Sequence, residues 1–96
     1  MTIKELKEIL ANKLASEGTY FTKADIIARK TKKGFTLHIK DYEHMPFHIT
    51  AEKDPYFGYT VWIQLHGSAI YFADSKKAYP WEEAIVNLGY YIGSRF

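Results

Sequence analysis

Apolar side chains near the N-terminus recur at helical spacing. The stripe, with Lys and Glu between its members, consists of Ile3, Leu6, Ile9, Leu10 and Leu14. Steps of three and four residues place these side chains on one face of a helix. Thr2 and Glu5 form a T-x-x-E capping box, which satisfies free amide groups at a helix start. Gly18 suits the positive φ of a helix C-terminus. The pattern therefore predicts an amphipathic helix between Thr2 and Gly18.

From residue 20 the period of the pattern changes from 3.6 to 2. Alternating apolar and polar residues predict strands at 20–30, 35–40, 47–52, 59–66 and 69–73. The segments between them have turn composition: Thr31-Lys32-Lys33-Gly34 is typical of a hairpin loop, and Asp54-Pro55-Tyr56-Phe57-Gly58 of a turn. Gly67-Ser68 suits a two-residue type II′ hairpin. Short connections of this kind join strands that are neighbours in an antiparallel sheet.

The last hairpin decides which side chains share a face of the sheet. A Gly67-Ser68 turn places Leu65 opposite Ile70 and Ile63 opposite Phe72, so that apolar residues meet apolar residues. The strands then agree on one apolar face. It is lined by Ile26, Phe35, Leu37, Ile39, Phe47, Ile49, Val61, Ile63, Leu65, Ile70 and Phe72. This face is predicted to be the core side of the sheet.

A second helix is predicted to begin near Pro80, which is at home in a first helical turn. Its apolar stripe is Trp81, Ala84, Ile85, Leu88 and Ile92. The element order is α-β-β-β-β-β-α. We expect residues 1–96 to form a single α+β domain, a five-stranded antiparallel meander with an N-terminal and a C-terminal helix packed on one face.

Composition excludes several classes of protein. The 96 residues contain no Cys, which excludes disulfide scaffolds, thiolate zinc sites and Cys nucleophiles. No apolar run approaches the roughly 18 residues of a membrane span, and the N-terminus has no signal-peptide pattern. No G-x-G-x-x-G, Walker, H-E-x-x-H or G-x-S-x-G motif is present. We expect a cytoplasmic protein that is not an enzyme and uses no cofactor and no metal.

The four histidines are the only candidates for metal or base chemistry. They are His38, His44, His48 and His66. Three imidazoles with an open position can bind Zn²⁺. The H-x₃-H spacing of His44 and His48 suits a helix, however, whereas this segment contains Pro46 and has a strand pattern. Half-solvated histidines on a sheet face are the better expectation.

The face away from the helices is predicted to carry more aromatic and apolar side chains than a bare sheet needs. Aromatic residues make up 17% of the chain. Exposed apolar patches mark interfaces, and Trp and Tyr are common at binding hot spots. The candidate partner-binding residues are Ile27, His38, His48, Trp62, Gln64, His66 and Tyr71, with Phe21 on the same face. We expect a small non-enzymatic binding protein, an inhibitor or adaptor of the kind that phages and mobile elements encode, docking on a protein partner. A symmetric homodimer would use the same face.

Charge supplies the alternative function. Residues 1–40 hold nine Lys or Arg against four Asp or Glu, whereas residues 41–96 hold four against seven. The candidate nucleic-acid-binding residues are Arg29, Lys30, Lys32, Lys33 and Lys40. Lysines on a hairpin can hold a phosphate backbone while neighbouring rings stack on bases. Lys33-Gly34-Phe35 also matches the first three positions of the RNA-recognition motif. A second alternative is a small ligand, or an unrecognised reaction, in an aromatic pocket between sheet and helices.

Overall fold

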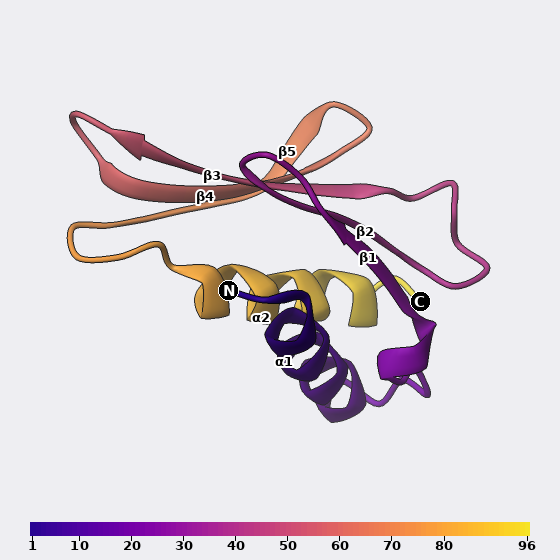
Figure 1. Cartoon of the computed structure of the whole chain (residues 1–96). Coiled ribbons are helices and arrows are strands. Elements are labelled where there is room, and N and C mark those ends of the chain that lie inside the picture. The colour runs from indigo at the N-terminus through magenta and orange to yellow at the C-terminus, as the bar shows by residue number, and fades with distance from the viewer.

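The computed structural model describes residues 1–96 as a sheet laid over two helices (Figure 1). The helices are α1 (Ile3–Ser16) and α2 (Trp81–Gly93). The strands are β1 (Ile26–Lys30), β2 (Gly34–Ile39), β3 (Phe47–Asp54), β4 (Gly58–Leu65) and β5 (Ser68–Ser75). All neighbours pair antiparallel in the order β1-β2-β3-β4-β5. The predicted fold class and element order are confirmed.

Helix α1 begins at the predicted capping box. The Thr2 hydroxyl accepts a hydrogen bond from the Glu5 amide at 3.1 Å, and the Glu5 carboxylate accepts one from the Thr2 amide at 3.0 Å. Hydrogen bonding of the Glu5 carboxylate to the Thr2 amide, and secondarily to the Thr2 side chain, holds the pKa of Glu5 below its ordinary value. The apolar stripe that follows puts Leu6, Leu10 and Leu14 out of contact with solvent. Helix α1 packs against α2 and β1.

The first strand is shorter than predicted. The expected strand at 20–30 contains a second, unrecognised cap: the Asp25 carboxylate accepts a hydrogen bond from the Thr22 amide at 2.8 Å. This bond closes the 3-10 turn η1 (Lys23–Asp25), so β1 begins only at Ile26. Phe21, expected on the outer face, instead packs edge-on against the rings of Tyr42 and Phe96, at 6.0 Å from each.

The core lies between the sheet and the helices. Sixteen buried side chains form one cluster, to which the odd-numbered positions of β2 and β4 contribute. Every residue of the predicted core face belongs to this cluster or packs against it, except Phe72. The two helices pack closely at Gly89, where a β-carbon would stand only 2.6 Å from Cγ of Lys13. Neither helix is both long enough and apolar enough to cross a membrane.

The β4–β5 hairpin differs from the prediction by one residue. Its turn residues are His66 (φ 52°) and Gly67 (φ 81°), not Gly67 and Ser68. Positive φ at both central positions is the type I′ geometry, which matches the right-handed twist of the strands. A bulge at Ile63/Gln64 then shifts the pairing. Leu65 consequently lies opposite Ser68 and Ile63 opposite Tyr71, so the predicted Leu65–Ile70 and Ile63–Phe72 pairs are both wrong.

A one-residue shift exchanges the two faces of a strand. Tyr71 therefore turns toward the helices and packs against the core, and Phe72 turns outward with 54% of its surface exposed. The Asp54 turn, in contrast, forms as predicted: its carboxylate accepts hydrogen bonds from the amides of Tyr56 and Phe57, at 2.7 and 3.0 Å. The β3–β4 end of the sheet projects beyond the start of α2 (Figure 1). This projecting end is called the overhang below.

Candidate functional site

The outer face of the sheet is not covered by either helix. Trp62 on β4 pairs directly with Phe72 on β5, and the Phe57 ring lies edge-on to Phe72 with 6.3 Å between centroids. Phe57 and Phe72 are 52% and 54% exposed, and Trp62 is half-buried. These three residues are called the aromatic patch. Exposure of apolar ring surface to water is energetically unfavourable, so a cluster of exposed rings is a candidate for contact with a partner.

Five of the seven predicted partner-binding residues lie on this face. Trp62 belongs to the aromatic patch, and His48 and Gln64 are paired beside it. Ile27 and His38 are paired with each other near the other edge of the sheet. His38 and Gln64 are half-buried, whereas Ile27 and His48 are exposed. The predicted set is thus spread across the face, and only part of it adjoins Trp62.

Tyr71 and His66 do not belong to the outer face. Tyr71 lies on the helix side, where burial, reinforced by the charge of Glu83 and a hydrogen bond to it, raises the pKa of the phenol above its ordinary value. His66 is exposed in the β4–β5 turn. Phe72 takes the place predicted for Tyr71. No local sequence signal separates the two residues, because the choice depends on the turn and the bulge.

The four histidines are dispersed over the sheet and its loops. No three His, Asp or Glu side chains gather where they could hold a metal ion. The one hydroxyl–imidazole contact joins Thr36 Oγ1 to His48 Nδ1 at 3.3 Å, on the exposed face. A nucleophile and base also need a third group to orient the ring. His44 lies in the loop after β2, beside the ring of Tyr42. The arrangement suits polar contacts with a partner.

Carboxylates border the aromatic patch. Glu52, Thr60 and Asp74 form one cross-strand row on the outer face, next to the row that holds Trp62 and Phe72. Asp74 is exposed and makes no ion pair, while Glu52 is paired with Lys33 at 2.6 Å. One carboxylate without an ion-pair partner, that of Asp74, therefore lies on this side of the patch. Sequence reasoning missed Asp74, Phe57 and Phe72 as members of this surface.

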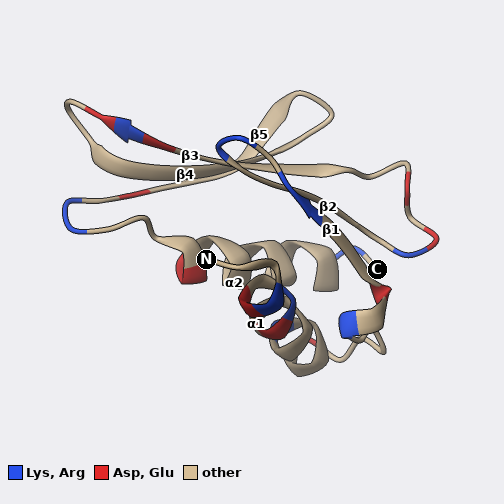
Figure 2. Cartoon of the chain, viewed as in Figure 1, with Lys and Arg blue, Asp and Glu red and all other residues tan.

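The candidate basic residues separate into three places. Lys30, Lys32 and Lys33 line a hollow of about 330 Å³ on the helix side of the sheet. Its wall includes Phe35, Tyr79 and Trp81. Arg29 lies on the outer face, opposite Thr36. Lys40 follows the far end of β2, about 20 Å from the hairpin at 3.3 Å per residue. Figure 2 shows the lysines at the β1–β2 turn and, separately, the basic loop before α2.

A second hollow, of about 210 Å³, lies between β5 and the C-terminal half of α2. Ile70, Tyr71 and Leu88 form its apolar wall, and Arg95 stacks over Tyr91 at its end, 3.9 Å from the ring centroid. Both hollows border the buried cluster, since Ile63 and Leu88 line this one and Phe35 lines the other. Aromatic side chains thus line both hollows, and the expectation of a small ligand there stays a prediction.

Comparison with protein-family models, with curated proteins and with solved structures finds no match for this chain. The chain carries an aromatic patch beside carboxylates on one face of the sheet, and lysines beside aromatic rings on the other.

Proposed function

We propose that this chain is a small non-enzymatic binding protein, an inhibitor or adaptor, that docks on a protein partner through the outer face of its sheet. The observation that carries the proposal is the aromatic patch: Phe57, Trp62 and Phe72 lie together on a face that no helix covers. Aromatic side chains in the centre of an interface supply a large part of its binding energy.

The charge around the patch indicates the kind of partner. Asp74 is exposed and unpaired, and Glu52 stands in the same cross-strand row. Carboxylates at the rim of an interface steer association with a surface of opposite charge. The partner we propose therefore has an apolar pocket rimmed by Lys or Arg. The exposed His48 and the half-buried Gln64 would add hydrogen bonds at the opposite rim.

The experiment compares an aromatic residue within the aromatic patch with one outside it. Trp62→Ala removes the half-buried ring of the patch, and Tyr56→Ala removes a ring at the tip of the β3–β4 turn that is 84% exposed. Partners are recovered from the native host by cross-linking, and the recovered partner is then purified for calorimetry. We expect Trp62→Ala to weaken binding of the purified partner by about 2 kcal/mol or more, and Tyr56→Ala to leave it unchanged.

Thermal unfolding of both variants shows whether the fold is intact. Wild-type affinity in a normally folded Trp62→Ala variant would remove the outer face from consideration. Concentration-dependent dimerisation that Trp62→Ala abolishes would instead identify a second copy of the chain as the occupant, and would contradict the proposal of a different partner protein.

A further inference from the structure

We infer a second binding site on the helix side of the overhang, for a segment of single-stranded nucleic acid. It is built from a row of aromatic rings flanked by lysines, called the lysine–aromatic strip. Its rings belong to Phe35, Tyr59, Tyr79 and Trp81; its lysines are Lys30, Lys32, Lys53, Lys76 and Lys77. The site lies on the opposite side of the sheet from the aromatic patch, so it goes beyond the proposed function.

The rings form a continuous path from the core to the overhang. Phe35 and Trp81 meet edge to face with 5.4 Å between centroids, Trp81 and Tyr79 lie 6.2 Å apart, and Tyr79 meets Tyr59 at 5.0 Å. Phe35 is buried, but the other three are half-exposed. Successive rings with free surface are the platforms on which unpaired bases stack, and such stacking works with any base.

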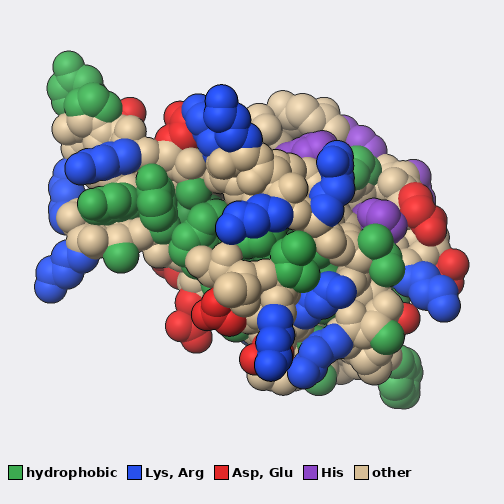
Figure 3. All heavy atoms as spheres, in the orientation of Figure 1, with side chains coloured by type: hydrophobic (Ala, Val, Ile, Leu, Met, Phe, Trp, Pro, Cys, Tyr) green, Lys and Arg blue, Asp and Glu red, His purple; other side chains and the backbone are tan.

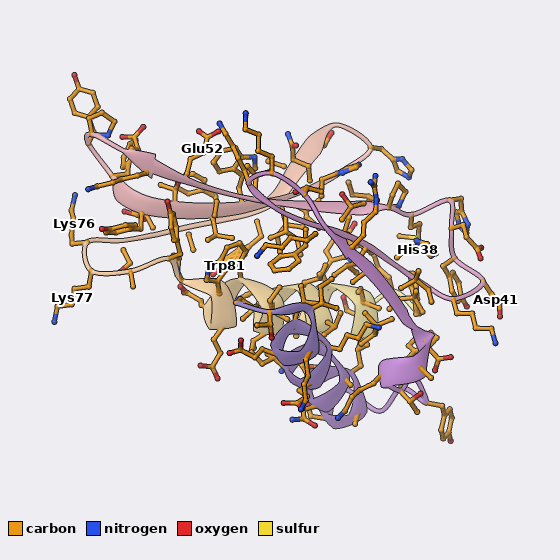
Figure 4. All side chains as sticks on the ribbon, viewed as in Figure 1. His38, Asp41, Glu52, Lys76, Lys77 and Trp81 are labelled. Carbon is orange, nitrogen blue, oxygen red and sulfur yellow. The ribbon has the colours of Figure 1, made fainter.

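Lysines stand on both sides of this path. Lys30 is in the same cross-strand row as Phe35, and Lys32 follows in the hairpin turn. At the other end the Lys53 ammonium lies over the Tyr59 ring, 5.3 Å from its centroid. Lys76 and Lys77 occupy the loop between β5 and α2, beside the overhang, as Figure 4 shows. A backbone that crosses the rings would therefore meet ammonium groups along its length.

These ammonium groups carry charge that no carboxylate offsets; one of them, Lys76 Nζ, donates a hydrogen bond to the backbone carbonyl oxygen of Tyr56 at 2.8 Å. None of the five lysines of the strip has a carboxylate within ion-pair distance; the ion pairs of the chain are Lys13–Glu17, Lys23–Glu8 and Lys33–Glu52. Lys33 also borders the hollow, but its ammonium is paired with Glu52, so it is not counted among the lysines of the strip. In Figure 3 the apolar side chains of the overhang run between lysines on the helix side of the sheet.

The hollow beside Trp81 gives the strip depth. Its volume of about 330 Å³ is at the lower end of the range for ligand sites. Gly34 lies in its wall, where a β-carbon would collide with the backbone carbonyl oxygen of Ile49, so that no larger residue fits there. Exposed rings stack on bases that are accessible, and the row of lysines binds phosphates, so the strip favours single-stranded nucleic acid. A duplex has its bases stacked inside, and an acidic peptide has no bases to stack.

The two tryptophans allow each surface to be followed separately. Trp62→Phe leaves Trp81, on the strip, as the only indole, and Trp81→Phe leaves Trp62, on the patch. Each protein is titrated with a short single-stranded oligonucleotide of mixed sequence. We expect quenching of Trp81 and no change at Trp62. We also expect the affinity to fall by roughly 50-fold between about 50 and 200 mM salt, as for a strand held at about four phosphates.

A matched pair of lysine variants tests the assignment. Lys30→Gln, Lys32→Gln and Lys53→Gln together should reduce the slope of log K against log salt by about 2 and lower the affinity at least tenfold at low salt. Lys23→Gln with Lys40→Gln, at the opposite end of the sheet, should leave both unchanged. Circular dichroism before and after titration establishes that every variant is folded.

Three outcomes would overturn the inference. Duplex of the same sequence could bind as tightly as the single strand; a mononucleotide could match the oligonucleotide; or polyglutamate could compete as well as an oligonucleotide of equal charge. Each would show that unpaired bases on a continuous strand are not what the site recognises. Quenching confined to Trp62 would likewise place any nucleic-acid binding on the outer face.

Discussion

The two sides of the overhang carry similar aromatic side chains in opposite electrostatic settings. On the outer face, Phe57, Trp62 and Phe72 stand beside Glu52 and Asp74. On the helix side, the rings of the lysine–aromatic strip lie among lysines that have no carboxylate partner. Rings supply binding energy on either surface, but the surrounding charge selects the partner. The outer face suits a basic protein surface, and the strip suits a polyanion.

One strand contributes to both surfaces. Along β4, Tyr59 belongs to the strip, Trp62 to the aromatic patch and Ile63 to the core. Alternation in a strand places neighbours on opposite faces, and the helices cover only part of the inner one. The inner face consequently changes from core to binding surface within a few residues, at the point where α2 begins (Figure 1).

The largest expected effect tests whether the two faces are distinct. Ile63→Ala should lower the free energy of unfolding by about 2–4 kcal/mol, because Ile63 is fully buried and truncation leaves a cavity. Trp62→Ala, one position away, should cost less than about 1 kcal/mol, the value of a cross-strand pair. Urea denaturation measures both. A larger loss at Trp62 than at Ile63 would reverse the assignment of the faces.

Two charge reversals test the electrostatic contrast directly. Asp74→Lys should weaken binding of the protein partner by about 1–2 kcal/mol, twice the value of an exposed ion pair, and leave oligonucleotide binding intact. Lys30→Glu should do the opposite. Calorimetry of both variants with both ligands measures the four values. Equal effects of either reversal on both ligands would mean that the protein has one binding surface rather than two.

A smaller effect should come from the start of α1, where Met1 lines the hollow of the strip. Thr2→Ala removes the hydroxyl that accepts a hydrogen bond from the Glu5 amide, and should lower the free energy of unfolding by about 1 kcal/mol. Ser16→Ala, at the exposed end of the same helix, is the control, with a change below about 0.5 kcal/mol. Equal losses in the two variants would contradict a specific role for the cap.

The smallest effect concerns Tyr71, which faces the helices where Phe72 was predicted to lie. Burial and Glu83 raise the pKa of Tyr71, so the folded state holds the phenolic proton more tightly than the unfolded state does. This contribution to stability is complete below pH 10.0, the ordinary pKa, and is lost as the pH rises through the raised value. Tyr71→Phe should therefore show a shallower decline of stability above pH 10.0 than the wild type. Identical declines would place the Tyr71 ring in solvent.

Much of the fold was predictable because local patterns and tertiary packing agree. The capping box at Thr2 and the alternation from Phe35 to Leu65 each act over a few residues, and both are confirmed. The cap between Thr22 and Asp25 was also local but was overlooked in a strand-like composition. The prediction failed where two turn types compete. His66-Gly67 and Gly67-Ser68 are both acceptable hairpin turns, and only the packed sheet with its bulge selects the first.

The order of helices and strands, and the buried face of β2, β3 and β4, follow from periodicity, because it encodes the environment of each side chain locally. Three features follow instead from packing between distant segments: Phe72 rather than Tyr71 faces outward, Phe57 joins Trp62, and Tyr59 and Tyr79 meet Trp81 among lysines. These groupings bring together residues from separate strands, turns and the start of α2. They depend on register, on one bulge and on how far the helices extend beneath the sheet, none of which is a property of a short stretch of chain.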